Sequence, residues 1–314
     1  MKKIQIQTVL IVSCILLLST ISRGYSQQNI SAKNKNDKSL NNTKIKNNMA
    51  TDTIKAYASV NGLKMYYEIV GTGHPVIILH GGFGNTELFM PNLTELAKNN
   101  KVILVDLQGH GRTADIDRPI VPDSLANDIA ALIKELKLGK TSVIGYSLGG
   151  LTTIRLAIQH PELLDKVVAI SAPFKRKGWF PDLLTQQDQM GPATAEMLKQ
   201  SPLYQSYQKL APKPEDWTKF VTKMAAFIQR DYDWSKEVAA IKLPVLLVAA
   251  DADGVMPEHM IEFYKLLGGG QKDAGWDGSA RPASQLAIIP GQTHYDLFMA
   301  PALPAVITPF INKK

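Results

Sequence analysis

Residues 143–150 read Val-Ile-Gly-Tyr-Ser-Leu-Gly-Gly, and they constrain the fold more than any other segment of the chain. The pattern Gly-x-Ser-x-Gly stands here between an apolar run at residues 141–144 and a helix-like segment at residues 151–159. In a strand–turn–helix of this kind the serine, here Ser147, occupies a sharp turn and projects its hydroxyl above the sheet. Glycines without a Cβ let the strained backbone form and let the helix begin close to neighbouring strands. The segment therefore predicts a buried strand, a turn and a helix in an α/β fold.

A serine in this position reacts only with a base and an orienting acid, which follow it in the order acid, then histidine. The apolar run at residues 243–250 reads as a strand buried on both faces, and Asp251 and Asp253 follow it. The next such run, residues 285–289, is followed by His294. We predict His294 as the base. Of the two carboxylates we favour Asp253, because Asp251 is nearer the strand and better placed to hold the loop.

Developing negative charge on a substrate oxygen requires a pair of backbone N–H donors. One should be the N–H of Leu148, which directly follows the serine, and the other should come from a loop after an earlier strand. Residues 76–79 form that strand, and the glycine-rich loop at residues 80–85 follows it. Gly82 or Phe83 is expected to supply the second donor, and the sequence leaves both open.

Taken together, these segments resemble the α/β-hydrolase superfamily over about residues 56–314. The resemblance is carried by His80-Gly-Gly-Phe-Gly84, Asp106-Leu-Gln-Gly-His-Gly-Arg112, Gly145-Tyr-Ser-Leu-Gly-Gly150, Asp253 with Pro257, and His294. It implies a mostly parallel eight-stranded sheet flanked by helices, with a triad of Ser147, Asp253 and His294. Residues 106–112 look like the family's turn after its fourth strand, at residues 101–107, and we interpret them as structural.

The segment between the sixth predicted strand, residues 167–170, and Pro244 contains no convincing buried strand but many aromatic and methionine side chains. In the family this place holds a helical cap over the active site. We therefore assign residues 56–172 and 239–314 to the α/β core and residues 173–238 to the cap. Most apolar cap side chains are expected in the cap's own core. We assign the candidate substrate-pocket residues as Trp179, Phe180 and Trp217, a lining that suits a bulky apolar substrate.

A second unusual segment is the glycine-rich run at residues 268–284, which carries Trp276 and lengthens the interval between Asp253 and His294 to 41 positions. Long loops without secondary structure are often functional. The alternative is a surface loop at the far end of the following strand, and we favour this second interpretation.

The N-terminus has the layout of an export signal. Lys2 and Lys3 precede an apolar stretch at residues 9–18, and small and polar residues follow up to Ser26. We assign residues 1–26 to a signal peptide and expect an exported, periplasmic or secreted protein. Residues 11–14 also resemble a bacterial lipobox, so that a lipoprotein anchored at Cys14 remains an alternative. Cys14 is the single cysteine, so after cleavage at Ser26 no disulfide is expected.

The net charge of +7 does not indicate a nucleic-acid partner. Residues 1–26 carry three of the excess positive charges and residues 27–55 carry the other four, which leaves the remaining chain neutral. Residues 27–55 are rich in Lys and Asn and poor in apolar residues, so we expect a disordered tether. The length and the 45% hydrophobic content suit one α/β domain with an insertion.

The resemblance and the ordered residues lead us to expect a serine hydrolase that cleaves a carboxylic ester or lactone through an acyl-enzyme, with no metal and no cofactor. The substrate is a small molecule, and macrolide-type lactones are one candidate group. A perhydrolase or haloperoxidase, a C–C bond hydrolase or an amidase uses the same scaffold and stays an alternative. A non-catalytic binding protein is a remote alternative, because such proteins typically lose a member of the triad. The oligomeric state is not predicted.

Overall fold

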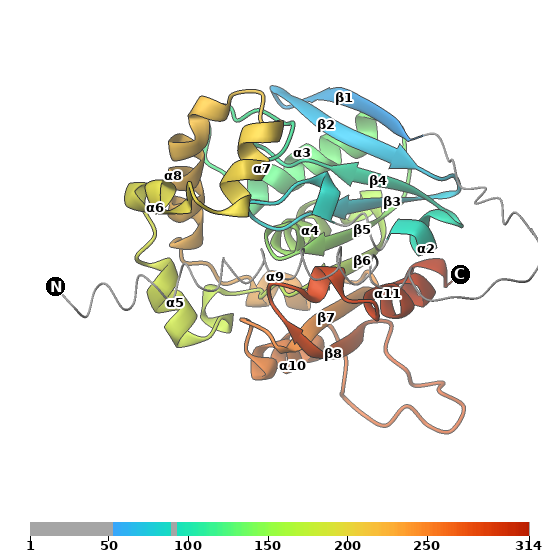
Figure 1. The fold of residues 1–314 in the computed structure, drawn as a ribbon. Helices are drawn as coiled ribbons and strands as arrows, with labels where there is room; N and C mark the ends of the chain where they lie inside the picture. Colours follow the sequence, from blue (N-terminus) through green and yellow to red (C-terminus); the bar gives the residue numbers. More distant parts are fainter. Residues whose placement is uncertain (1–52, 89–92, 314) are drawn as a thin grey trace, which may run out of the picture.

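Eight strands of the described chain form one sheet. The computed structural model describes residues 53–88 and 93–313. The strands are β1 (Ile54–Val60), β2 (Leu63–Val70), β3 (His74–Leu79), β4 (Asn100–Val105), β5 (Thr141–Tyr146), β6 (Leu164–Ile170), β7 (Val245–Ala252) and β8 (Gln285–Thr293). Their order is β1-β2-β4-β3-β5-β6-β7-β8. Only the β1–β2 and β2–β4 pairs are antiparallel. The predicted mostly parallel, eight-stranded sheet is confirmed (Figure 1).

Helices cover both faces of the sheet, which explains why the central strands read as continuous apolar runs. Helices α3 (Pro122–Glu135), α4 (Leu148–Gln159) and α10 (Pro257–Leu266) pack on one face, and α2 (Leu93–Ala97) and α11 (Leu303–Asn312) on the other. Ile77 and Ile78 show the consequence: they are neighbours in β3, point to opposite faces, and are both buried. Burial of one such side chain contributes about 1.5–3 kcal/mol.

The cap follows β6 and lies beyond one end of the sheet, at the left in Figure 1. It comprises η3 (Arg176–Gly178), α5 (Pro181–Gln187), α6 (Pro192–Leu198), α7 (Pro202–Leu210), η4 (Pro214–Asp216) and α8 (Trp217–Ile228). Helix α8 turns Phe220, Val221 and Met224 inward, at helical spacing, and all three are buried. This arrangement is consistent with the cap that we predicted after the sixth strand.

The expected cap boundary at residue 238 falls inside a helix of the core layer. Helix α9 (Ser235–Ala239) contacts α4 and α10, and its Glu237 forms an ion pair of 2.8 Å with Arg155 of α4. The segment therefore returns to the core a few residues before the expected boundary.

A further difference concerns the end of the expected tether. Strand β1 begins at Ile54, so the last two residues of the expected tether are part of the sheet. Helix α3 begins at Pro122, whose fixed φ suits the first helical position. Asp123 lies inside the helix, where it pairs with Arg155 at 2.7 Å.

Residues 268–284 form neither helix nor strand, and in Figure 1 they project from the molecule between α10 and β8. The loop leads into the amino end of β8, whereas His294 follows the carboxyl end of the same strand. Trp276 is fully exposed. This placement fits the surface-loop interpretation.

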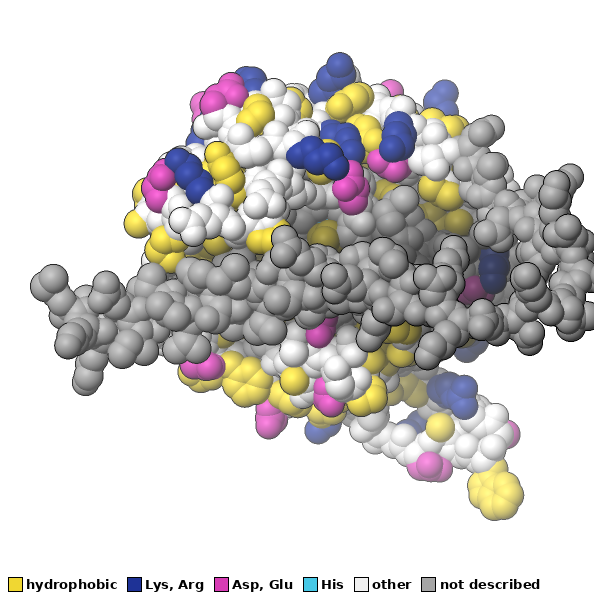
Figure 2. All heavy atoms as spheres, in the orientation of Figure 1, with side chains coloured by type: hydrophobic (Ala, Val, Ile, Leu, Met, Phe, Trp, Pro, Cys, Tyr) yellow, Lys and Arg dark blue, Asp and Glu magenta, His cyan; other side chains and the backbone are white. Residues whose placement is uncertain are grey.

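The predicted signal peptide, Cys14 and most of the predicted tether lie outside the described residues. In the part of the chain that the structure describes, no helix is long and apolar enough to cross a membrane. On the face drawn in Figure 2, Lys and Arg side chains lie interspersed with Asp and Glu over the described surface.

Candidate active site

Ser147 occupies the turn between β5 and α4 with an unusual backbone conformation. Its φ of 52° and ψ of −114° lie where residues with a Cβ are strained. Helix α4 starts very close to the neighbouring strand, and this is possible because Gly149 has no Cβ. A Cβ added there would lie 2.4 Å from the carbonyl oxygen of Leu79. The Ser147 side chain stays partly exposed at the carboxyl edge of the sheet. The sequence pattern therefore forms the expected strand–turn–helix.

His294 contacts both Ser147 and Asp253. Its Nε2 lies 3.1 Å from Ser147 Oγ, and its Nδ1 lies 2.9 Å from Asp253 Oδ1. A carboxylate oxygen only accepts, so Nδ1 carries the proton and Nε2 presents a lone pair to the serine hydroxyl. The structure thus brings together the three residues predicted as a triad, in the arrangement that proton transfer from serine to histidine requires.

Asp253 is buried and held by four donors. Its Oδ1 accepts from His294 and from the N–H of Val255, at 3.1 Å. Its Oδ2 accepts from the N–H of Ala250, at 3.2 Å, and from the Ser171 hydroxyl. Burial raises the pKa of Asp253, but the bond and charge of His294 and the other donors outweigh it, so the pKa lies below its ordinary value. The group is therefore ionised at neutral pH.

Asp251 lies in the last part of β7 and does not contact His294. It is exposed, and its Oδ1 accepts from the N–H of Gln292 at 3.2 Å. Of the two carboxylates that the sequence offered, the structure places Asp253 against the base and Asp251 against the last residues of β8.

The loop after β3 lies directly against the nucleophile. Gly81 and Gly84 close a tight turn, in which Gly84 N donates to Gly81 O at 3.1 Å and Phe83 has a φ of 61°. A Cβ added at Gly81 would lie 3.3 Å from Ser147 Cβ. Gly82 and Phe83 are the two central residues of this turn, so both candidate donors belong to the segment beside the serine.

The other predicted donor is the N–H of Leu148, the first residue of helix α4. The first N–H groups of a helix have no partner within it, and the positive end of the helix dipole attracts negative charge. A substrate oxygen next to Ser147 would meet these amides on one side and the loop after β3 on the other.

Two contacts that position the triad were not predicted from the sequence. One is the Ser171 hydroxyl on Asp253. The other is Tyr146, the residue before the serine, whose buried hydroxyl donates to the backbone carbonyl of His294. A Cβ at Gly81 would lie 2.8 Å from the Tyr146 ring. Tyr146 thus contacts the base and the loop after β3. No motif marks such contacts, because they join strands whose relative placement appears only in the folded chain.

The three candidate pocket residues take different positions. Trp179 lies at the triad: its ring meets the His294 ring edge to face, with centroids 5.2 Å apart, and it forms a β-bridge with Val255. Phe180 is 39% exposed, just before α5.

Trp217 corrects the expectation that it lines the pocket. It is 2% exposed, and its Nε1 donates to the carbonyl of Ala195 in α6 at 2.9 Å. Its ring contacts Tyr204, Tyr207 and Phe220. An indole with its N–H bonded within the cap belongs to the cap core.

Asp106 makes structural contacts, in agreement with our interpretation of residues 106–112 from the sequence. It is fully buried, and its two carboxylate oxygens accept from the N–H groups of Thr86 and Arg112, both at 2.7 Å. Burial raises the pKa of Asp106 to about 6 against these hydrogen bonds. Among the described residues no group of three His, Cys, Asp or Glu side chains is arranged to hold a metal ion.

Comparisons with known proteins agree with this geometry. Residues 74–216 match the family model described as alpha/beta hydrolase fold. The chain is 29% identical over 236 residues to the AB hydrolase superfamily protein YisY of Bacillus subtilis, covering 67% of this chain and 84% of that one.

Two solved structures share the fold. The enol-lactonase from Burkholderia xenovorans has a TM-score of 0.61 at 18% identity, over 82% of this chain and 100% of that chain. The carboxylesterase CesB from Bacillus subtilis also has a TM-score of 0.61, at 17% identity, over 84% and 93%. The chain thus has the α/β-hydrolase fold, and its similarity to α/β-hydrolase superfamily proteins supports a hydrolase.

Proposed function

We propose that the protein hydrolyses carboxylic esters or lactones by nucleophilic catalysis at Ser147. The observation that carries the proposal is the hydrogen-bonded chain from Ser147 through His294 to Asp253, at a strained turn beside the loop after β3. His294 Nε2 takes the Ser147 proton as Oγ attacks the carbonyl carbon. Asp253 stabilises the imidazolium that forms, and water later releases the acyl group.

The negative charge of the tetrahedral intermediate falls on the former carbonyl oxygen. We assign its stabilisation to the N–H of Leu148 and to one of the two central amides of the 81–84 turn, Gly82 or Phe83. Removal of one such donor typically costs about 10²–10³ in kcat.

The substrate side favours an apolar ester or lactone. Trp179 covers one side of His294, and Phe83 of the loop after β3 packs on Phe220 of α8, with ring centroids 5.4 Å apart. Aromatic walls of this kind bind apolar acyl or alcohol groups. We therefore extend the proposal to bulky apolar substrates, with macrocyclic lactones as one candidate.

A substrate panel tests this proposal. The purified protein and Ser147→Ala are compared on p-nitrophenyl acetate, a p-nitrophenyl ester of a medium-chain acid, a macrocyclic lactone and a matched anilide. We expect turnover of the esters or the lactone that is lost in Ser147→Ala, with higher kcat/KM for the larger acyl group. Cleavage of the anilide alone, or turnover that survives in Ser147→Ala, would contradict the proposal.

We also propose that the enzyme works outside the cytoplasm, on the support of the signal-like residues 1–26. Mass spectrometry of the mature N-terminus tests this: a chain that begins at Gln27 fits a cleaved signal peptide, and a lipid-modified Cys14 fits an anchored lipoprotein. An intact Met1 in protein from the cytoplasm would contradict the proposal.

A further inference from the structure

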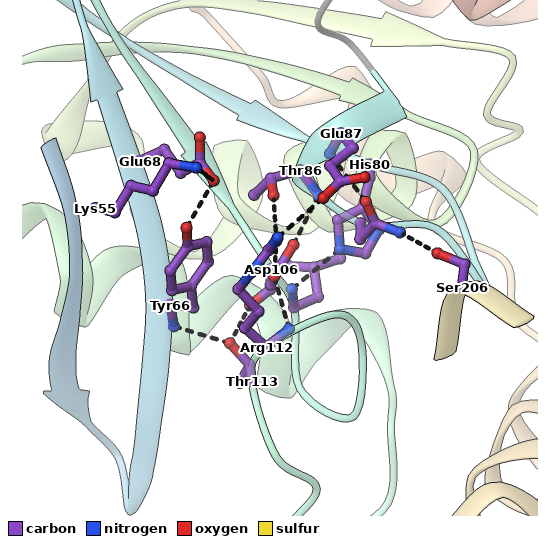
Figure 3. Close-up of polar contacts among 12 residues, drawn as sticks. Lys55, Tyr66, Glu68, His80, Thr86, Glu87, Asp106, Arg112, Thr113 and Ser206 are labelled. Atoms are coloured by element: carbon purple, nitrogen blue, oxygen red, sulfur yellow. Dashed lines mark hydrogen bonds and ion pairs between the residues drawn. The ribbon is translucent and has the colours of Figure 1, made fainter. Parts of the chain in front are cut away.

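The loop after β3 is fixed from the core side by a buried polar cluster. The Asp106 carboxylate accepts hydrogen bonds from the N–H of Thr86 in this loop and from the N–H of Arg112 in the loop after β4 (Figure 3). His80 donates from Nδ1 to Gly81 O at 2.7 Å and accepts the N–H of Leu107 on Nε2 at 3.1 Å. Both ring nitrogens of His80 therefore have a partner, so His80 ties the loop to the turn after β4.

From the other side the same loop is bonded directly to the cap. The side-chain amide of Asn85 donates to the hydroxyl of Ser206 in α7 at 3.0 Å, and Figure 3 shows Ser206 reaching the loop. Asn85 Oδ1 also accepts the N–H of Glu87 at 2.9 Å, which fixes the amide in one orientation. Asn85 is buried and Ser206 is half-buried, so this bond is partly shielded from water.

A cavity of about 10 Å³ lies at the same seam, with Ser206, Asn85 and His110 among its lining residues. His110 is 1% exposed, and its Nδ1 donates to Gln108 O at 2.8 Å. Its Nε2 is a buried lone pair without a hydrogen-bond partner in the described part of the chain. Burial, with a smaller effect of the neighbouring His80, lowers the pKa of His110 to about 3, so the ring is neutral. The cavity has the size of one water molecule.

We propose that Asn85, Ser206 and His110, with one water molecule in this cavity, form a polar latch through which cap helix α7 positions the loop after β3. The inference rests on the proposed function, because it assigns that loop one of the oxyanion donors. The water donates a hydrogen bond to His110 Nε2, which removes the cost of a buried unpaired acceptor. The cap thereby sets the geometry of the donor amide as well as the shape of the pocket.

The latch predicts a kinetic effect of a particular kind. The donor amide acts on charge that develops only in the transition state, so a loosened loop should lower kcat and leave KM nearly unchanged. Loss of one buried hydrogen bond in Ser206→Ala should lower kcat about three- to tenfold. Ser206→Thr keeps the hydroxyl and should retain most of the activity.

Ser201→Ala is the matched control, because it weakens the same helix without touching the loop. Ser201 caps α7 by accepting the N–H of Tyr204. This variant should lower Tm and leave kcat unchanged, when kcat is referred to active sites titrated with a fluorophosphonate. Asn85→Ala combined with Ser206→Ala should be little worse than Asn85→Ala alone, because Asn85→Ala already removes the bond to Ser206.

A crystal structure of the wild-type protein checks the water directly. We expect an ordered water within hydrogen-bond distance of His110 Nε2. A dry cavity, or a Ser206→Ala protein whose titrated sites keep the wild-type kcat, would overturn the latch. A wild-type protein that neither hydrolyses esters nor reacts with the fluorophosphonate would overturn the proposed function instead, so the two failures are distinguishable.

Discussion

Two carboxylates stand two positions apart at the end of β7, and small differences in backbone position give them separate surroundings. Asp253 accepts the Nδ1 proton of His294, whereas Asp251 is exposed and bonds the backbone of Gln292. The sequence favoured Asp253 by its distance from the strand, and the geometry agrees with that choice.

Replacement of the two carboxylates separates their roles. Asp253→Asn should lower kcat by about 10³–10⁴-fold, because an amide in this position no longer holds the histidine in the tautomer that accepts the serine proton. Asp251→Asn should change kcat less than about threefold, since it alters an exposed loop contact. Steady-state kinetics on one ester, with circular dichroism to verify folding, measures both. If Asp251→Asn proves the crippling change, the assignment of the acid is wrong.

Ser171 offers a sharper test of positioning. Its hydroxyl bonds Asp253, and its φ of 50° is unfavourable for any residue with a Cβ. Ser171→Ala removes the hydroxyl and keeps the strained backbone, whereas Ser171→Gly removes the hydroxyl and relieves the strain. Both should lower kcat by about tenfold, the scale of one hydrogen bond to a charged group. Ser171→Gly should be the more stable of the two in thermal denaturation. A kcat that follows Tm across the pair would show that Ser171 is structural only.

At the scale of elements, the sequence predicted the sheet well because strands buried on both faces leave a simple apolar signal. The sites where polar residues follow strands β3, β5, β7 and β8 were equally visible, since the carboxyl ends of parallel strands meet at one edge. The cap was less predictable. No local pattern tells which of its aromatic residues face the active site, and only packing decides that Trp179 meets His294 while Trp217 faces the cap interior.

The two tryptophans should therefore respond differently to truncation. Trp179→Ala should change the preference between large and small esters by about 1–3 kcal/mol in relative kcat/KM, because it removes an aromatic surface beside the triad. Trp217→Ala should instead destabilise the protein by about 3–5 kcal/mol through the cavity it leaves, with the same fractional loss of activity for every substrate. Phe180→Ala changes a half-exposed ring and should affect stability least.

Kinetics on an acetate and a medium-chain ester, together with Tm, distinguish these outcomes for each variant. If Trp179→Ala lowers kcat/KM by the same factor for both esters, this ring does not form part of the pocket.

At the scale of the whole molecule, three buried histidines make stability dependent on pH. Burial lowers the pKa of His80 to about 4, of His110 to about 3 and of His259 to about 4. An unfolded histidine binds a proton near pH 6.5. Below that pH the unfolded chain therefore binds protons that the folded chain does not, and the free energy of unfolding falls. Asp106 has the opposite effect on the free energy of unfolding. Because its pKa in the folded chain is raised to about 6, the folded chain binds this proton first, which stabilises the protein as the pH falls from about 6 to the ordinary pKa of aspartate.

We expect a clear fall of Tm between pH 7 and pH 5, with each histidine contributing at most about 2 kcal/mol. His259→Gln should flatten this dependence without affecting the active site, because the glutamine oxygen can accept the N–H of Phe174 that His259 now accepts at 3.2 Å. The measurement is Tm against pH for both proteins in one buffer series. Parallel curves would show that His259 does not contribute.

A second grouping of serine, histidine and aspartate lies at the opposite end of the sheet and shows what a site requires. His74 Nε2 lies 3.0 Å from Ser142 Oγ and 3.6 Å from Asp165 Oδ2. Both contacts use the same ring nitrogen, so the ring cannot pass a proton from one partner toward the other, and Ser142 is fully buried. Residue types alone do not define the site; their geometry does.

The most direct test of the account is the place at which a fluorophosphonate reacts, determined by peptide mapping of the labelled protein. We predict one phosphonyl adduct, on Ser147, with its rate of formation reduced by several orders of magnitude in His294→Ala. No adduct, or an adduct on another serine such as Ser142, would contradict the claim that Ser147 is the nucleophile of this hydrolase.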